Sequence, residues 1–310
     1  MNTEDEELAE LDRESQRPEP KDETLSVFDA LRARSAHPVD PVRLKADDRF
    51  AFRCHKGVAC WNVCCQGADI TLTPYDILRL ARHLAIRPAE FLALYAIPAL
   101  HDRANLPIAK LRMGGAEGKG PCPFMTDAGC KVYAERPATC RYYPLGLVSM
   151  KMKDAEKKED FNFLVREDHC QGHAGPRQQT VADWRAEQGT DAGLAVDRGW
   201  IDILMKMTSW SSIGGPMGKA PSPKTQKMFF MATTDVDAFR RFVFETRFLD
   251  SYELDPAAVE RLKADDEALL ALAQDWLKNV LFNEPTIALK EAVLKGAIAK
   301  AHRDLAAGEG

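Results

Sequence analysis

The sequence lacks the features that assign a chain to several common protein classes. No stretch approaches the roughly 18 consecutive apolar residues that a membrane-spanning helix requires. The acidic start, Asn2–Glu7, carries no apolar stretch of the kind found in secretory signals. The formal net charge of -5 gives no reason to expect nucleic-acid binding. We therefore expect a cytoplasmic protein that has neither a membrane nor a nucleic acid as partner.

Several short motifs are missing as well. No Cys-x-x-Cys pair occurs, which excludes zinc ribbons, many iron–sulfur loops and thioredoxin-like redox pairs. Cys60 and Cys64 match the first two positions of the radical-SAM pattern Cys-x3-Cys-x2-Cys, but the third position is Gly67. The glycine-rich run 114–120 lacks the Gly-Lys-Ser/Thr ending of a phosphate-binding loop. A flexible approach to Cys122 is the better interpretation of that run.

What the sequence does contain is a concentration of cysteine. All eight cysteines fall between residues 54 and 170, and four of them lie within residues 54–65. Because cytoplasmic thiols are kept reduced, the cluster favours metal or redox chemistry over disulfides. The candidate metal ligands are Cys54, Cys60, Cys64, Cys65, Cys122, Cys130, Cys140 and Cys170.

The spacing leaves the arrangement of these ligands open. A disulfide within the adjacent pair Cys64–Cys65 would need a strained ring, so the two thiols can serve different sites, or one can bind metal while the other packs. Eight thiols suffice for two four-coordinate metals, or for one four-cysteine iron–sulfur cluster with four residues left for a second site. His55, His169 and His173 flank the cysteines and could replace one, and His173 is the best placed of them.

The composition and pattern predict a mainly α protein with small β-hairpins, in the α+β class. We expect three parts: an acidic, disordered tail over residues 1–48, an irregular cysteine-rich metal-binding domain over 49–175, and a helical C-terminal region over 176–310. The C-terminal region would pack on the cysteine domain or present a surface to a protein partner. Within it, residues 228–231 suggest a short apolar strand or buried turn, and Pro256 opens a long helix that reaches Val280.

Local signals predict how the cysteine segments are held. Phe50 and Phe52 indicate a short strand, residues 70–72 a short extended piece, and Thr73–Pro74 the start of a helix. Residues 101–121 indicate an extended segment or a loop. Residues 122–133 predict a hairpin that turns at Asp127–Gly129 and brings Cys122 near Cys130.

The next segments concern Cys140 and Cys170. Pro137 indicates a helix start, where the positive end of the helix dipole would favour the Cys140 thiolate. Residues 145–148 and 161–165 predict paired strands joined by the charged loop 151–160. That pairing would return Cys170 to the neighbourhood of Cys140.

Several of these segments resemble a known family. Its motifs include Leu72-Thr73-x-x-Asp76, Cys122-Pro123-Phe124 and Cys170-x-Gly172, together with Gly129-Cys130-x-Val132-Tyr133-x-x-Arg136-Pro137-x-x-Cys140-Arg141. Over about residues 50–175 the chain is similar to the cysteine-cluster family, also called CxxCxxCC, YkgJ-like, or the zinc- or iron-chelating domain. The resemblance implies a cytoplasmic metal-binding domain, with zinc or iron as the metal and a 4Fe-4S cluster as one form of the iron.

Three functions are open at this point. In the first, the thiolates form a structural or redox-active metal centre. In the second, the protein is an enzyme that uses this centre, such as a methyltransferase similar to the flagellin lysine N-methylases, which form one branch of the family. In the third, an exposed and labile site makes the chain a module for metal delivery or sensing.

Overall fold

The computed structural model describes residues 43–150, 159–212, 220–296, 299 and 303. The fold is mixed α+β, with helices and small antiparallel sheets of two or three strands, which confirms the predicted class. Of the predicted tail, residues 1–42 lie outside the described part. No helix in the described part is long and apolar enough to cross a membrane.

The chain divides into two compact units, and each is assembled from two segments. Unit 1 comprises Met1–Trp61 and Tyr142–Arg185, and unit 2 comprises Asn62–Arg141 and Ala186–Gly310. The division falls inside the first cysteine cluster, between Trp61 and Asn62. The domain boundaries expected after residues 48 and 175 stay a prediction.

Unit 1 contains two small antiparallel pairs of strands. Strand β1 (Arg49–Ala51) pairs with β9 (Gln178–Thr180), and β7 (Leu145–Met150) pairs with β8 (Glu159–Leu164). Phe50 and Phe52 are buried against Trp184, with ring centroids 6.2 and 5.5 Å from the indole. The strand predicted at the two phenylalanines and the later strand pair are therefore confirmed. Most of the loop predicted between the paired strands, residues 151–158, lies outside the described residues.

Unit 2 begins with a three-stranded sheet and two helices. The elements are β2 (Thr71–Leu72), α3 (Pro74–His83), α4 (Pro88–Tyr95), β3 (Ala96–Leu100) and β4 (Pro107–Leu111), and the strand order is β2-β4-β3. Thr73 caps α3 as predicted. Its side chain accepts the Asp76 N–H, the Asp76 carboxylate accepts the Thr73 N–H, and Pro74 occupies the first turn. Since β4 lies at the centre of the sheet, the extended alternative predicted for residues 101–121 is confirmed at Pro107–Leu111.

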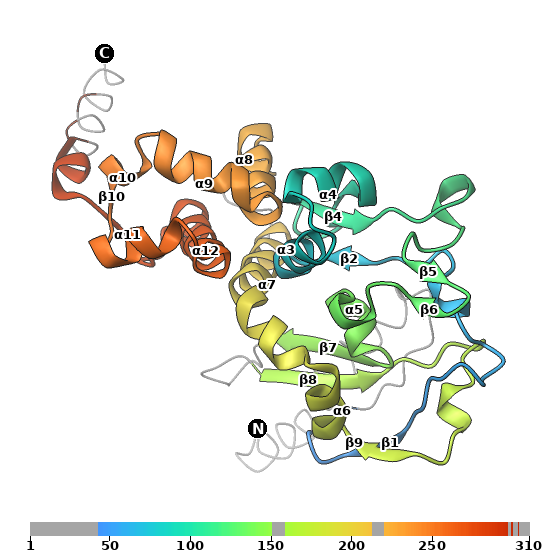
Figure 1. Cartoon of the computed structure of the whole chain (residues 1–310). Helices are drawn as coiled ribbons and strands as arrows, with labels where there is room; N and C mark the ends of the chain where they lie inside the picture. The colour runs from blue at the N-terminus through green and yellow to red at the C-terminus, as the bar shows by residue number, and fades with distance from the viewer. Residues whose placement is uncertain (1–42, 151–158, 213–219, 297–298, 300–302, 304–310) are drawn as a thin grey trace, which may run out of the picture. The chain divides into compact units, whose positions relative to one another are not determined.

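The rest of unit 2 is helical. Helix α12 packs against α7, α8 and α9 around the buried residues Phe229, Leu269 and Leu277. Phe229 lies inside α8, so the strand or buried turn predicted at residues 228–231 is wrong. The elements are α7 (Thr190–Ser212), α8 (Pro223–Thr234), α9 (Val236–Glu245), α10 (Phe248–Ser251), α11 (Pro256–Leu262) and α12 (Asp266–Phe282), with β10 (Tyr252–Glu253) paired to β11 (Ala288–Leu289) (Figure 1).

The long helix predicted from Pro256 is interrupted. Helix α11 ends at Leu262, and α12 begins after Asp265, whose carboxylate accepts the N–H groups of Glu267 and Ala268. This side-chain cap starts a new helix where the apolar pattern alone continues. The predicted single helix is therefore two helices.

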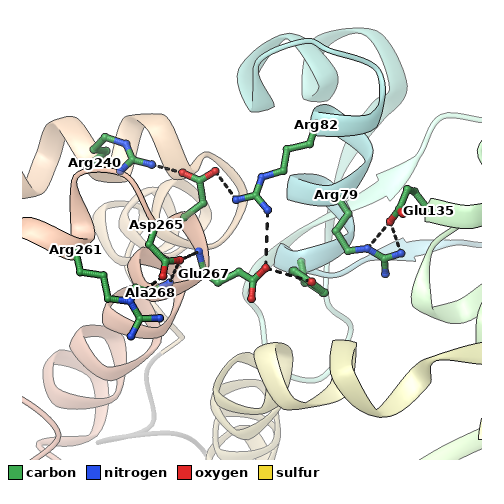
Figure 2. A network of polar contacts seen from close by, with 10 residues as sticks. Arg79, Arg82, Glu135, Arg240, Arg261, Asp265, Glu267 and Ala268 are labelled. Atoms are coloured by element: carbon green, nitrogen blue, oxygen red, sulfur yellow. Dashed lines mark hydrogen bonds and ion pairs between the residues drawn. The ribbon is translucent and has the colours of Figure 1, made fainter. Parts of the chain in front are cut away.

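Ion pairs fix α3 against its neighbours within unit 2, as Figure 2 shows. Arg82 contacts Asp266 at 2.8 Å and Glu267 at 3.8 Å, both on α12. On the next turn, Arg79 pairs with Glu135. Partly exposed pairs of this kind each contribute little to stability, so their main consequence is orientation. The apolar face of α3, with Ile77 and Leu80 fully buried, anchors the helix.

Candidate metal centre

All eight cysteines carry free thiols. The division of the chain separates them into two sets, which are described one at a time. The unit 2 thiols are Cys64, Cys65, Cys122, Cys130 and Cys140. The unit 1 thiols are Cys54, Cys60 and Cys170.

In unit 2, backbone pairing brings two cysteine segments together. Cys64 and Cys65 lie on the short 3-10 helix η1 (Val63–Cys65), and the segment that follows runs antiparallel to residues 120–122. The Cys122 N–H donates to the Cys65 carbonyl at 2.8 Å, and the Gly67 N–H donates to the Gly120 carbonyl at 2.8 Å. These two bonds make Cys65 and Cys122 neighbours although 56 residues separate them along the chain.

The glycine run before Cys122 is a place where the chain crosses itself. The Gly120 N–H donates to the Gly114 carbonyl at 2.7 Å, and Gly115 adopts a positive φ of 72°. A Cβ placed on Gly120 would lie 2.7 Å from the carbonyl carbon and oxygen of Gly114, which is closer than real Cβ atoms approach. Glycine is therefore needed here for close backbone approach.

The hairpin predicted around Cys130 is confirmed. Strand β5 (Met125–Thr126) pairs antiparallel with β6 (Gly129–Cys130), and Gly129 supplies a positive φ of 119° at the turn. Cys122 and Cys130 both pack against the core that contains Phe124. The η1 segment is tied to the same hairpin, because the Asn62 side-chain amide donates to the Thr126 carbonyl at 2.8 Å.

Cys140 lies on the short helix α5 (Ala138–Tyr142), which follows the 3-10 helix η3 (Tyr133–Glu135). Two arginines brace this segment. Arg141 donates to the carbonyls of Arg136 at 3.0 Å and Gln188 at 2.8 Å, and Arg136 donates to the Tyr133 carbonyl at 2.6 Å while stacking over its ring. The guanidinium groups are thus used mainly to hold the backbone, although the Arg136 charge also offsets part of the rise that burial causes in the pKa of Cys130.

The environment of the unit 2 thiols opposes their ionisation. Burial raises the pKa of Cys140 to about 12, and the nearby Asp76 carboxylate adds to the effect. The residue as a whole is exposed, yet its sulfur is surrounded by protein atoms. The predicted lowering of this pKa by the helix start is therefore wrong: α5 has only 5 residues, and its first N–H is already bonded to Asp76.

The same interactions show which thiols share a neighbourhood. The pKa of Cys65 is raised by a hydrogen bond with Cys64, by burial and by the charges of Cys122 and Cys140. Cys140 is influenced in turn by Cys122, Cys130 and Cys64. Within the described residues, no three His, Cys, Asp or Glu side chains have the arrangement of a formed metal site. The five thiols are gathered in one region but are not closed around a common point.

In unit 1, a second set of bonds brings together the segments that carry the three cysteines. The Gln171 N–H donates to the Cys60 sulfur at 3.2 Å, and the Arg53 N–H donates to the Gly172 carbonyl at 2.9 Å. Cys54 and Cys60 therefore both flank the segment that carries Cys170. The 3-10 helix η4 (Gly172–Ala174) follows at once, and its His173 ring lies 5.1 Å from the Phe52 ring.

Cys140 and Cys170 belong to different units, so their expected proximity stays a prediction. The pairing of β7 with β8, from which it was inferred, is present in unit 1. Asp76 and Asp197, two carboxylates that are 2% and 3% exposed, have no role in the sequence-based prediction. The Thr73-x-x-Asp76 spacing could have revealed the cap of α3, but not the bond from Asp76 to Ala138, 62 residues later.

Comparison with known proteins identifies the cysteine-bearing segment. Residues 53–171 match the model of one family, CxxCxxCC, described as "Putative zinc- or iron-chelating domain". The segment is similar to this family, and residues 53–171 are called the CxxCxxCC domain below. The family inferred from the sequence motifs is thereby confirmed for these residues, which include all eight cysteines. No curated protein and no solved structure matches the chain.

The residues of the CxxCxxCC domain fit the metals in the family description. Thiolate sulfur is a preferred ligand of zinc and the usual ligand of iron–sulfur clusters. The unit 2 thiols offer five such donors from separate chain segments, and the unit 1 thiols offer three more. The family description and this donor set both support metal binding.

Proposed function

We propose that the CxxCxxCC domain binds zinc or iron in the cytoplasm through a structural or redox-active thiolate centre formed by the unit 2 thiols. One observation carries the proposal: Cys64, Cys65, Cys122, Cys130 and Cys140 come from distant segments and act on one another electrostatically. Crowded, desolvated thiolates repel, and this raises their pKa values. A bound cation would offset that repulsion and stabilise the deprotonated form.

The unit 1 thiols are proposed to form a second, smaller set. Cys54, Cys60 and Cys170 provide three sulfur donors, and His173 on the adjoining η4 is the candidate for a fourth. The Gln171 N–H donates to the Cys60 sulfur and ties it to the segment that carries Cys170. In this arrangement all eight cysteines are ligands.

The identity of the metal decides the role of the centre. Zinc has no redox chemistry, so a zinc centre would be structural. An iron–sulfur cluster would supply one-electron chemistry, tuned by burial and by hydrogen bonds to the sulfurs. In either case, the part played by this chain is to supply deprotonated sulfur and to hold it in a largely desolvated region.

Anaerobic purification with elemental analysis and visible spectroscopy tests the proposal directly. We expect zinc or iron to copurify in a fixed ratio to protein. A brown protein with broad visible absorption would identify an iron–sulfur centre, and a colourless protein with bound zinc would identify a structural one. A preparation with neither metal, in which all eight thiols react as free, would refute the proposal.

A second candidate function, metal delivery or sensing, is favoured by the solvent exposure of Cys54 and Cys64. Exposed ligands allow a competing chelator or an acceptor protein to reach the metal. If this function is correct, we expect a mild chelator to remove the metal within minutes under native conditions. Colorimetric detection of the metal–chelator complex measures the loss. Retention of the metal until the protein unfolds would instead assign it a structural role.

A further inference from the structure

We infer that Asp76 is the positioning residue of the proposed unit 2 centre: it ties the start of α5 to α3 and thereby sets where the Cys140 thiol lies. The inference rests on the proposed function for its consequence, metal retention. Its geometric basis lies entirely within unit 2 and does not depend on the metal.

The two oxygens of Asp76 serve two different helices. Oδ2 accepts the Thr73 N–H at 3.1 Å, which closes the cap of α3. Oδ1 accepts the Ala138 N–H at 2.9 Å, which is the first backbone donor of α5. The side chain is 2% exposed, so water is largely excluded from both bonds. The Asp76 carboxylate therefore links the start of α3 to the start of α5, which are far apart in the sequence.

Helix α5 is held by bonds to other segments: the Asp76 bond fixes its start, and the Arg141 bond to the Gln188 carbonyl holds its end. With 5 residues, it is too short to be stable alone, because fixing the first turn of a helix costs more than its few hydrogen bonds return. Helix α3, in contrast, is anchored by fully buried Leu80 and by Arg82 paired to α12. Because α3 is held in place, the Asp76 bond to the Ala138 N–H also fixes the position of the segment that carries Cys140.

The chemistry of Asp76 suits positioning. Both of its oxygens already accept backbone N–H groups, and burying a carboxylate is tolerated only with such bonds. A metal ligand must be held in position by hydrogen bonds from neighbouring residues, since a thiol on a loose segment cannot hold a metal in fixed geometry. Asp76 is thus expected to act on the metal through Cys140.

Asp197 provides a matched control. It is 3% exposed, and its Oδ1 accepts the Tyr75 N–H at 3.1 Å at the same end of α3. Both carboxylates are buried, and both cap N–H groups of the Thr73–Asp76 turn. Only the Asp76 bond at Ala138 reaches the segment of Cys140, so Asp76→Asn and Asp197→Asn separate the loss of a buried carboxylate from the loss of the link to α5.

The experiment compares the two variants in the full chain. The first readout is the rate at which iodoacetamide alkylates Cys140 in chelator-treated protein, measured by peptide mass spectrometry. The second is the ratio of zinc or iron to protein. For Asp76→Asn we expect Cys140 alkylation to rise about tenfold and metal retention to fall, because a charge-assisted bond at the start of α5 is weakened. Asp197→Asn should leave both values near those of the unaltered protein.

The outcomes separate this inference from the proposed function. Equal alkylation of Cys140 in both variants would overturn the positioning role even if the protein binds metal. Absence of metal from the unaltered protein would count against the proposed function, and the alkylation readout would still decide the positioning role. If Asp76→Asn does not fold, hydrogen exchange in the unaltered protein replaces it. The Ala138 amide should then be protected as strongly as the amides of α3, and free exchange there would overturn the inference.

Discussion

Cys140→Ser is expected to reduce the metal bound by the unit 2 thiols and to destabilise the CxxCxxCC domain. The Cys140 sulfur interacts electrostatically with those of Cys64, Cys122 and Cys130. Its removal therefore takes away a thiol that lies near the other three. A serine hydroxyl is not a ligand of structural zinc sites or of the usual iron–sulfur clusters. Structural zinc contributes about 10–16 kcal/mol to folding in small domains, so loss of the metal should also lower thermal stability markedly. Elemental analysis and thermal unfolding measure the two effects.

Cys60→Ser is the companion variant, because Cys60 belongs to the unit 1 thiols. It should leave the metal held by the unit 2 thiols in place, so the two variants should lose different fractions of the total. Retention of full metal content with unchanged stability in Cys140→Ser would show that Cys140 is not a ligand. Equal and complete loss of metal in both variants would contradict the proposal that the unit 1 thiols and the unit 2 thiols bind metal separately.

Gly120→Ala is expected to destabilise the CxxCxxCC domain and to lower its metal content. The new Cβ would lie 2.7 Å from the Gly114 backbone, and a backbone cannot rotate away as a side chain can. Neighbouring backbone bonds oppose a shift of this strand away from Gly114: the Gly120 carbonyl accepts the Gly67 N–H, and the Cys122 N–H donates to the Cys65 carbonyl. Overpacking of this kind costs about 1–3 kcal/mol. Denaturant unfolding and metal analysis of the purified variant measure the outcome.

Gly296→Ala is the matched control for that substitution. Gly296 is helical, and a Cβ built on it meets no atom within 4 Å. Alanine in a helix is favoured over glycine by about 0.5–1 kcal/mol, so this variant should be as stable as the unaltered protein or slightly more so. Identical behaviour of Gly120→Ala and Gly296→Ala would show that the chain crossing at Gly114 does not constrain the domain.

Local signals in the sequence were sufficient for several elements near the cysteines. Thr73 and Pro74 define the start of α3, because a side-chain acceptor and a proline at the first turn act within a few residues. The turn at Asp127–Gly129 predicts the hairpin for the same reason, since its glycine has the required φ. The fold class and the family follow from such short-range patterns.

Elements that depend on long-range contacts were not predictable in this way. Strand β3 carries Pro98, which argues against a strand, and it is tolerated because β3 lies at the edge of its sheet. The apolar run at residues 228–231 fits a strand or a helix by pattern alone, and packing of α8 in the helical core decides for the helix. The pKa of Cys140 was predicted with the wrong sign because burial and Asp76 are invisible along the chain.

The first cysteine cluster also shows that spacing along the chain does not predict which residues lie together in the fold. Residues 54–65 are contiguous, yet Cys54 and Cys60 belong to unit 1 while Cys64 and Cys65 belong to unit 2. Nearness along the chain therefore gave no guide to which thiols act together. The partners of each pair come from later segments, through the backbone bonds at Cys122 and at Gln171.

The chain crossing at Gly114 and Gly120 has a consequence for the evolution of chain length. Two backbone bonds close the loop at its base, while Ala116, Glu117 and Lys119 at its tip are exposed. Because the free energy of closing a loop grows only slowly with its length, extra residues at the tip would cost little. Natural insertions and deletions, or an engineered reporter peptide, are accordingly best accommodated at Glu117, where the register between Cys65 and Cys122 is unaffected.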